Sequence, residues 1–240
     1  MKQKQTQHWK TTKATADVVY ALLLRGQDYL SNTKLVKVKL GNTEITPQKV
    51  EAGTNFYEKV YLKDEILPEF SDIKLTKEDK GIAWGGFYFQ YFEDMSKVTP
   101  YTTNLQLEKK LFVNRETKEG KIIEPLKGPL KVGDLITVRI VLRVDRDMEY
   151  VHLKDLRGSG LEPVDVLSGY RYQDGLMYYQ STRDVATHFF IDYLPKGTYV
   201  FQYDLRVQHK GFYQSGIAEI QCMYAPEFSS HSQSQWLEVE

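Results

Sequence analysis

The polar residues with the clearest potential for chemistry are His188 and Asp192. They lie four positions apart in a stretch of strand-like alternation, so both side chains are expected on one face of a strand. A histidine and a carboxylate on one face could form an acid–base dyad or supply two metal ligands. Because no third group is evident beside them, the favoured interpretation is an outward polar face or a contact with a neighbouring domain.

An acidic turn is the second candidate. Asp145, Asp147 and Glu149 could bind Ca²⁺, but their spacing is not that of an EF-hand. An acidic β-turn is a far more common origin for such a cluster, and His209 and His231 are isolated in the sequence. No metal ligand is therefore assigned.

The signatures of common enzyme classes are absent. The sequence has no G-x-S-x-G, H-E-x-x-H, Walker or G-x-G-x-x-G motif. The Gly-Ser-Gly at 158–160 has no helix pattern after it and is interpreted as a turn. The sequence therefore assigns no catalytic residue and no cofactor, and it predicts that the chain is not an enzyme.

The single cysteine, Cys222, excludes an intramolecular disulfide and a cysteine-based metal cluster. Its position on the apolar face of a predicted strand indicates a buried, unreactive thiol rather than a nucleophile.

Charge and composition exclude two classes of partner. The 240 residues carry 32 basic and 32 acidic side chains, which argues against nucleic acid or an anionic membrane surface as the main partner. The neighbouring Lys109 and Lys110, with the lysines at 118, 121 and 127, alternate with glutamates and are interpreted as a solvated face. The sequence contains no run of about 18 apolar residues, so no transmembrane helix is predicted. The polar N-terminus MKQKQTQHWK does not resemble a signal peptide.

The elements that must position these residues are mostly strands. Residues 199–207 and 217–224 alternate between apolar and polar side chains and are predicted to form a hairpin. A long strand is predicted at 135–144, and residues 150–156 are expected to pair back on it. With 17 Tyr, 11 Phe and frequent turn residues, the pattern predicts an antiparallel β-sandwich.

The first part of the chain is more varied. Residues 11–26 show helical spacing after a threonine cap and end at a glycine. This helix could be the remnant of a preceding helical domain or a terminal helix docked on a sheet. Further strands are predicted at 36–40, 56–62, 73–75 and 82–92. The last is aromatic on both faces, which indicates cover on both sides by its own core and by a neighbouring domain or subunit.

Three stretches carry a family resemblance. The first, at 9–23, is WKTTKATADVVYALL, and it resembles the last helix of the thioester domain in alpha-2-macroglobulin family proteins. The second, at 81–94, is GIAWGGFYFQYFED, and it is similar to the closing strand of the CUB-type domain that follows. The last third of the chain, including RVDRDMEYVHLKD, DGLMYYQSTRDVATHFFIDYLPKGTYVFQYDLRVQHKG and IQCMYAPEFSSHS, resembles the C-terminal macroglobulin-like domain of Bacteroidetes-type homologues.

The resemblance implies three regions. Residues 1–30 would hold the terminal helix of the thioester-type domain, residues 31–98 an incomplete CUB-like β domain, and residues 99–240 the C-terminal, receptor-binding-type β-sandwich. Because the family inserts its helical domain into the CUB domain, residues 33–98 would lack the strands that precede the insertion. That segment is expected to be partly mispaired, mobile or packed against another molecule.

The function implied by the resemblance is that of a C-terminal structural fragment of a protease-trapping endopeptidase inhibitor. The family's Cys-Gly-Glu-Gln thioester motif and its bait region are absent from the sequence, so no residue of the trapping chemistry is assigned. The implied partners are the parent's thioester domain and, for the full-length parent, target proteases, in a bacterial periplasm or on the cell surface. An interdomain contact face is suggested at Trp84, Tyr88, His188 and Asp192.

An autonomous binding module for surface glycan or protein remains the alternative. It would use exposed tyrosines and tryptophans, so it loses its motive if Trp84, residues 87–91 and residues 170–179 are mostly buried within the fold.

Overall fold

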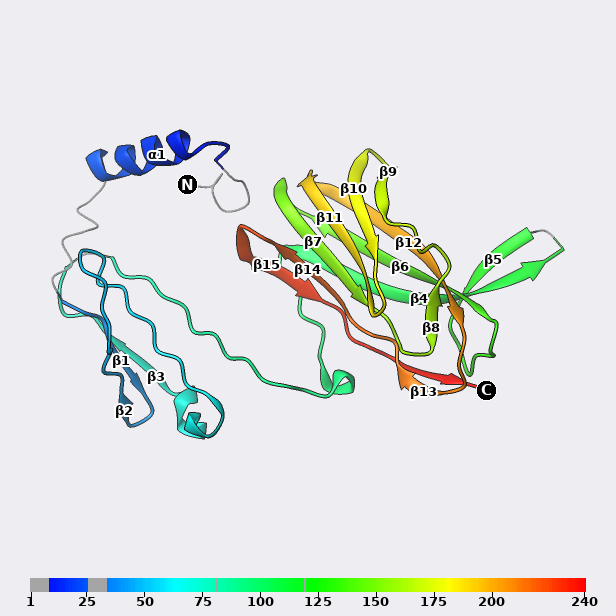
Figure 1. Cartoon of the computed structure of the whole chain (residues 1–240), viewed down its shortest axis with the longest axis horizontal. Helices are drawn as coiled ribbons and strands as arrows, with labels where there is room; N and C mark the ends of the chain where they lie inside the picture. Colours follow the sequence, from blue (N-terminus) through cyan, green and yellow to red (C-terminus); the bar gives the residue numbers. More distant parts are fainter. Residues whose placement is uncertain (1–8, 26–33, 81, 119) are drawn as a thin grey trace. The chain divides into compact units, whose positions relative to one another are not determined.

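The computed structural model describes residues 9–25, 34–80, 82–118 and 120–240. The described residues fall into two compact units, 9–90 and 91–240, each described by itself (Figure 1). The sequence placed a boundary slightly later, between residues 98 and 99, and that domain assignment stays a prediction.

Among its described residues, the first unit contains one α-helix, two single-turn helices and one small sheet. Helix α1 (Thr12–Arg25) confirms the predicted helix, and the Ala14 amide donates to Oγ1 of Thr11 over 3.1 Å as a cap. None of the residues of α1 is buried. The predicted stop at Gly26 lies outside the described residues.

The small sheet has the order β2-β1-β3 and is antiparallel throughout. It comprises β1 (Lys37–Leu40), β2 (Thr43–Glu44) and β3 (Ile73–Thr76), and two single-turn helices, η2 (Lys63–Glu65) and η3 (Pro68–Ser71), precede β3. Val38 and Leu40 are its buried side chains.

Two strands predicted for this unit, at 56–62 and 82–92, are wrong for the described residues. Neither segment forms a ladder with a described strand. Apolar alternation favours an extended backbone, whereas a strand also requires a neighbour that exchanges backbone hydrogen bonds with it. The aromatic segment at 82–92 is mostly exposed, with Trp84 at 82% and Tyr88 at 92%.

The second unit confirms the predicted antiparallel β-sandwich (Figure 1). It begins with the single-turn helix η4 (Met95–Lys97) and has a six-stranded sheet, a five-stranded sheet and a small two-stranded sheet, β13-β16. The six-stranded sheet runs β15 (Ala225–His231), β14 (Ala218–Cys222), β7 (Met148–Leu156), β11 (Ala186–Leu194), β10 (Leu176–Thr182) and β9 (Gly169–Gln173). The five-stranded sheet runs β5 (Gly120–Pro125), β4 (Leu105–Thr117), β6 (Leu135–Val144), β12 (Gly197–Val207) and β8 (Leu161–Pro163), and the small sheet pairs β13 (Gly211–Gln214) with β16 (Trp236–Val239).

One hydrophobic core lies between the two large sheets. Strand β6 supplies the alternate residues Ile136, Val138, Ile140, Leu142 and Val144, all buried as its pattern predicted. The opposite sheet contributes alternate residues of β7, β11 and β14 to the same core. The alternation therefore identifies correctly which face of each strand is apolar.

The predicted pairings of these strands are wrong. Strand β12 pairs with β6 and β8, whereas β14 pairs with β7 and β15 in the other sheet. Residues 150–156 likewise do not pair back on β6, because β7 lies between β11 and β14. Each connection crosses from one sheet to the other, which brings the two apolar faces together across the core rather than side by side.

A close backbone approach fixes one of these crossings. Gly216, just before β14, has φ +82°, and a Cβ at this position would lie 2.2 Å from the carbonyl oxygen of Leu156. Only glycine can hold the backbone of β14 this close to the end of β7.

We expect Gly216→Ala to reduce the free energy of unfolding by about 2–5 kcal/mol, through left-handed strain plus overpacking. Gly175 is a matched control, since its φ is +80° and a Cβ there would meet nothing within 4 Å. Gly175→Ala should therefore lose only about 1 kcal/mol. Urea unfolding followed by circular dichroism measures both, and equal losses would show that the contact with Leu156 is unimportant.

Candidate functional site

The four residues of the predicted contact face lie in different units. Trp84 and Tyr88 belong to residues 9–90, and both are exposed. His188 and Asp192 lie on β11 in the sandwich unit, where His188 is half-buried and Asp192 is exposed. The face as a whole stays a prediction.

His188 and Asp192 do not form a dyad. They share the outward face of β11 as predicted, but residues four apart on a strand are separated by about 13 Å. Phe190 occupies the position between them on the same face. His188 instead has a histidine neighbour: its Nδ1 lies 3.0 Å from Nε2 of His152 on β7.

His152 was missed by reasoning from the sequence, because it lies 36 residues before His188. The pairing of β7 with β11 places His152 opposite Phe190, which is two residues from His188 on the same face of β11. Only the register of two strands that are distant in sequence reveals this neighbour.

A row of rings continues from this pair across the outer face of the six-stranded sheet. His152 is opposite Phe190, Phe190 is opposite Tyr179, and Tyr179 is opposite Tyr170. We call these four residues the outer aromatic row. The rings of His152 and Phe190 are nearly parallel, with centroids 4.7 Å apart, and Tyr170 meets Tyr179 edge-on at 5.1 Å.

The outer aromatic row presents apolar surface to solvent. Tyr170 is 72% exposed and Phe190 44% exposed, while the alternate residues Phe189 and Ile191 face the core. Tyr172 and Met177 extend the exposed surface beside the row, at 74% and 61% exposed. A contiguous apolar surface of this kind is typical of a binding face.

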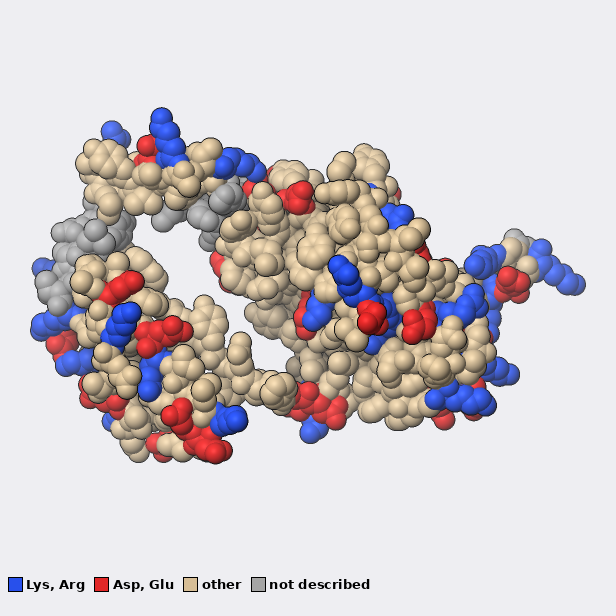
Figure 2. All heavy atoms as spheres, in the orientation of Figure 1, with Lys and Arg blue, Asp and Glu red and all other residues tan. Residues whose placement is uncertain are grey.

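The charges around the row are mixed. Lys154 lies 3.9 Å from Glu219 beside the histidine pair. On the face drawn in Figure 2, basic and acidic side chains are interspersed rather than gathered into a patch of one sign. The drawn face thus shows no single-sign patch of the kind that favours nucleic acid.

Both histidines of the pair are held toward the neutral form. Burial lowers the pKa of His152, and the neighbouring His188 and Lys154 act in the same direction, against a weaker effect of Glu219. Burial also lowers the pKa of His188, with help from the positive charges of Lys154 and Arg183. In a neutral pair, one of the two facing nitrogens can donate an N–H to the other. If both nitrogens carried a proton, neither could accept, and the hydrogen bond would be lost.

The acidic turn uses its carboxylates within the fold. Asp145 accepts from Asn104 and Arg146, and Asp147 accepts from the Tyr193 hydroxyl and the Lys196 amide. Hydrogen bonds to these donors lower the pKa of both aspartates. Among the described residues, no group of three His, Cys, Asp or Glu side chains could hold a metal ion.

Cys222 is buried on β14, which confirms the expectation of a buried thiol. Its Sγ contacts the carbonyl oxygen of Glu149 at 3.5 Å. Burial raises the pKa of the Cys222 thiol, which disfavours the reactive thiolate.

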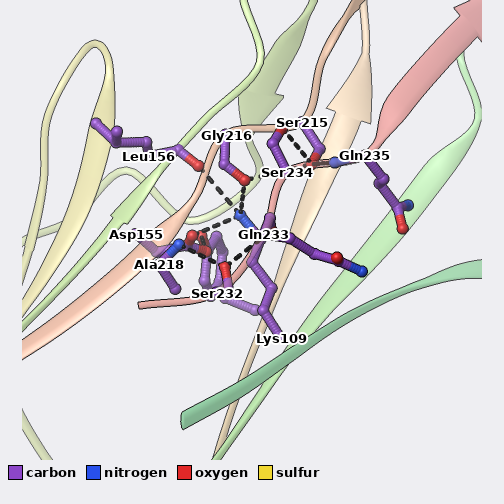
Figure 3. A network of polar contacts seen from close by, with 11 residues as sticks. Lys109, Asp155, Leu156, Ser215, Gly216, Ala218, Ser232, Gln233, Ser234 and Gln235 are labelled. Carbon is purple, nitrogen blue, oxygen red and sulfur yellow. Dashed lines mark hydrogen bonds and ion pairs between the residues drawn. The ribbon is translucent and has the colours of Figure 1, made fainter. Parts of the chain in front are cut away.

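A second polar group lies inside the sandwich, where the sequence predicted a solvated lysine. Lys109 on β4 has a side chain only 4% exposed, and its Nζ lies 2.5 Å from Oδ1 of the fully buried Asp155 on β7. The ammonium also donates to the carbonyl oxygens of Leu156 at 3.2 Å and Gly216 at 3.1 Å (Figure 3). Tyr203 on β12 donates its hydroxyl to Oδ2 of Asp155 over 2.5 Å. We call Lys109, Asp155 and Tyr203 the ionic node.

The ionic node joins the two sheets through their core. Lys109 and Tyr203 come from the five-stranded sheet and Asp155 from the six-stranded sheet. Burial raises the pKa of Asp155, while Lys109, Tyr203 and Arg157 act against that rise. All three N–H groups of the ammonium have acceptors, so the pair meets the condition under which a buried charge is tolerated.

Two antiparallel sheets around one core place this protein in the β-sandwich class. The family model for the bacterial alpha-2-macroglobulin MG10 domain matches residues 105–227, just over half of the chain. The chain belongs to this family.

Some solved structures of bacterial alpha-2-macroglobulins are similar to part of this chain at low sequence identity. Salmonella alpha-2-macroglobulin reacted with methylamine is 20% identical at TM-score 0.47, covering 59% of this chain and 10% of that chain. The native Escherichia coli protein from domain MG7 to the C-terminus is 17% identical at TM-score 0.48, covering 60% of this chain and 25% of that chain. The E. coli protein activated by porcine elastase is 19% identical at TM-score 0.49, covering 60% of this chain and 14% of that chain.

In each case the aligned part is a quarter or less of the solved chain. A search of curated proteins found no match. Among the described residues, no helix is long and apolar enough to cross a membrane.

We expect Lys109→Met to reduce the free energy of unfolding by about 3–5 kcal/mol, because it leaves the carboxylate of Asp155 buried without its cation. Lys110 is a matched control on the same strand, with a side chain 62% exposed. Lys110→Met should change stability by no more than about 0.5 kcal/mol. Chemical denaturation of both variants tests this, and a similar small effect in each would contradict a structural role of the node.

The histidine pair predicts that acid weakens the fold. The pKa of each histidine is lower in the folded chain than its ordinary value of 6.5, so the unfolded chain binds more protons below that pH. The contribution of the pair to the free energy of unfolding should be fully present above about pH 6.5 and should decrease as the pH drops below that value. In thermal unfolding, the melting temperature of the double variant His152→Gln, His188→Gln should fall less between about pH 7.5 and about pH 5.5 than that of the wild-type chain.

The exposed His209 provides the control, because His209→Gln replaces a histidine that is not part of the pair. An unchanged pH profile in the double variant would show that the pair does not cause the loss of stability in acid.

Proposed function

We propose that this chain is the C-terminal structural part of an alpha-2-macroglobulin-like endopeptidase inhibitor. The match of residues 105–227 to the bacterial MG10 family carries the proposal. The sequence has no Cys-Gly-Glu-Gln thioester motif, and no bait region is identified in it. The role of this part is therefore to hold other domains of the parent and to help shield its reactive bond, not to catalyse or to trap.

The contact surface in this proposal has two parts. In the sandwich unit it is the outer aromatic row with His188 and Asp192, and in the other unit it is the exposed segment that contains Trp84 and Tyr88. Large exposed rings support this assignment, because covering them with another domain would bury apolar surface worth about 25 cal/mol per Å². The proposed partners are the parent's thioester domain and, for the full-length parent, its target proteases.

The proposed location is the bacterial periplasm or the cell surface, where a protease trap would meet foreign proteases. The balanced charge and the interspersed surface charges support protein partners rather than nucleic acid.

An autonomous glycan- or protein-binding module is the second candidate, and the exposure of the aromatic residues favours it. Trp84, Tyr88 and Tyr170 are each more than 70% exposed, so burial within the fold does not remove the motive for this alternative. Exposed rings can stack on sugar rings as well as on a neighbouring domain.

Two measurements separate these functions. At stoichiometric amounts, the 240-residue chain should leave a panel of endopeptidases fully active on protein substrates, while the full-length parent inhibits them. Inhibition by the chain alone would overturn the structural role. A glycan array should show no saturable binding, whereas saturable binding that Tyr170→Ala abolishes would favour the binding module. The control Tyr178→Phe keeps the ring at a buried position.

A further inference from the structure

The ionic node holds an amine against a carboxyl group in a place that water does not reach. Nζ of Lys109 and Oδ1 of Asp155 are 2.5 Å apart, and the two side chains are 4% and 0% exposed. We propose that Lys109 and Asp155 are the site of an intramolecular isopeptide bond, an amide between Nζ of Lys109 and Cγ of Asp155. This modification is independent of the proposed function.

The surroundings of Lys109 fix the direction of its amine. Two N–H groups donate to the carbonyl oxygens of Leu156 and Gly216, and the third donates to Oδ1 of Asp155 (Figure 3). The nitrogen is tetrahedral, so loss of the third proton leaves a lone pair on the side of the Asp155 carboxyl group. The two carbonyl groups thus hold the nucleophile in place, and such fixed proximity replaces a bimolecular encounter.

The carboxyl group is placed to accept this attack. The Tyr203 hydroxyl donates to Oδ2 over 2.5 Å, so it can stabilise the negative charge that develops on that oxygen. Burial raises the pKa of Asp155, which favours the neutral acid form of this carboxyl group. Transfer of one proton from Nζ to Oδ1 then gives the neutral amine and the neutral acid that the condensation needs.

The step balances without an oxidant or a further reactant. The Nζ–Cγ bond forms and the Cγ–Oδ1 bond breaks. Two of the three protons of the ammonium leave with Oδ1 as one water molecule, and the third remains as the amide N–H. No electrons are gained or lost, and the two buried charges disappear together.

The product keeps the polar contacts of the site. Its amide oxygen is the former Oδ2, which still accepts from Tyr203, and its N–H can donate to Leu156. The carbonyl oxygen of Gly216 retains a contact with Oγ of Ser215 at 3.3 Å. The amide also ends the desolvation penalty of a buried ion pair, while it joins two strands from opposite sheets covalently.

The test is the mass of the full 240-residue chain under denaturing conditions. We expect a main species lighter than the linear sequence by one water molecule, in protein that has been kept folded at neutral pH. Digestion with trypsin should then give a branched peptide that contains Lys109 and Asp155, with no cleavage after Lys109.

Lys109→Arg keeps the positive charge but offers no amine, so it should have the full linear mass. Tyr203→Phe keeps both reacting groups and should lower the fraction of cross-linked chain. The Asp174-Gly175 sequence can also lose water by cyclising, and peptide mapping of the wild-type chain separates that product from the branched peptide.

The proposal would be overturned if wild-type protein, after prolonged incubation, gave separate linear tryptic peptides for Lys109 and for Asp155. This result needs no variant, so it holds even where Lys109→Arg does not fold. It would leave the node as a non-covalent ion pair.

Discussion

The contact between Lys109 and Asp155 is the constraint on which the sandwich depends. A charge inside an apolar core is tolerated only where its partner and all its hydrogen bonds are in place. Here the partners come from different sheets, and one carbonyl acceptor belongs to Gly216, whose lack of a side chain allows the approach to Leu156. The relative position of β4, β7 and the start of β14 is therefore specified by polar geometry as well as by apolar packing.

The outer face of the six-stranded sheet takes no part in the apolar packing around this node. Strand alternation sends Phe189 into the core and Phe190 outward, so the same strands build both surfaces. The outer aromatic row is accordingly attached to a rigid framework, and its rings are held in register by the strand ladders. This is the face that the proposed contact with another domain of the parent would use.

Much of this could be predicted from residues alone. The alternation of β6 and β12 identifies their apolar faces, the threonine before α1 marks the start of the helix, and Cys222 falls on a buried face. The pairing of β12 with β14 and the solvated state of Lys109 were wrong. Alternation shows which face of a strand is apolar but not which neighbour accepts its backbone hydrogen bonds, and a lysine beside glutamates looks the same whether it points outward or inward.

The class of fold follows from the sequence, since a period of two over many short segments separated by turn residues is typical of strands in an antiparallel β-sandwich. The last third of the sequence also resembles the C-terminal macroglobulin-like domain of alpha-2-macroglobulins, and the match of residues 105–227 to the bacterial MG10 family confirms that family. The contacts of His152 with His188 and of Lys109 with Asp155 are visible only in the folded chain, because both pairs join strands that are distant in sequence. Their contacts depend on the order and register of strands across two sheets, and these follow from the packing of the whole core rather than from any local pattern.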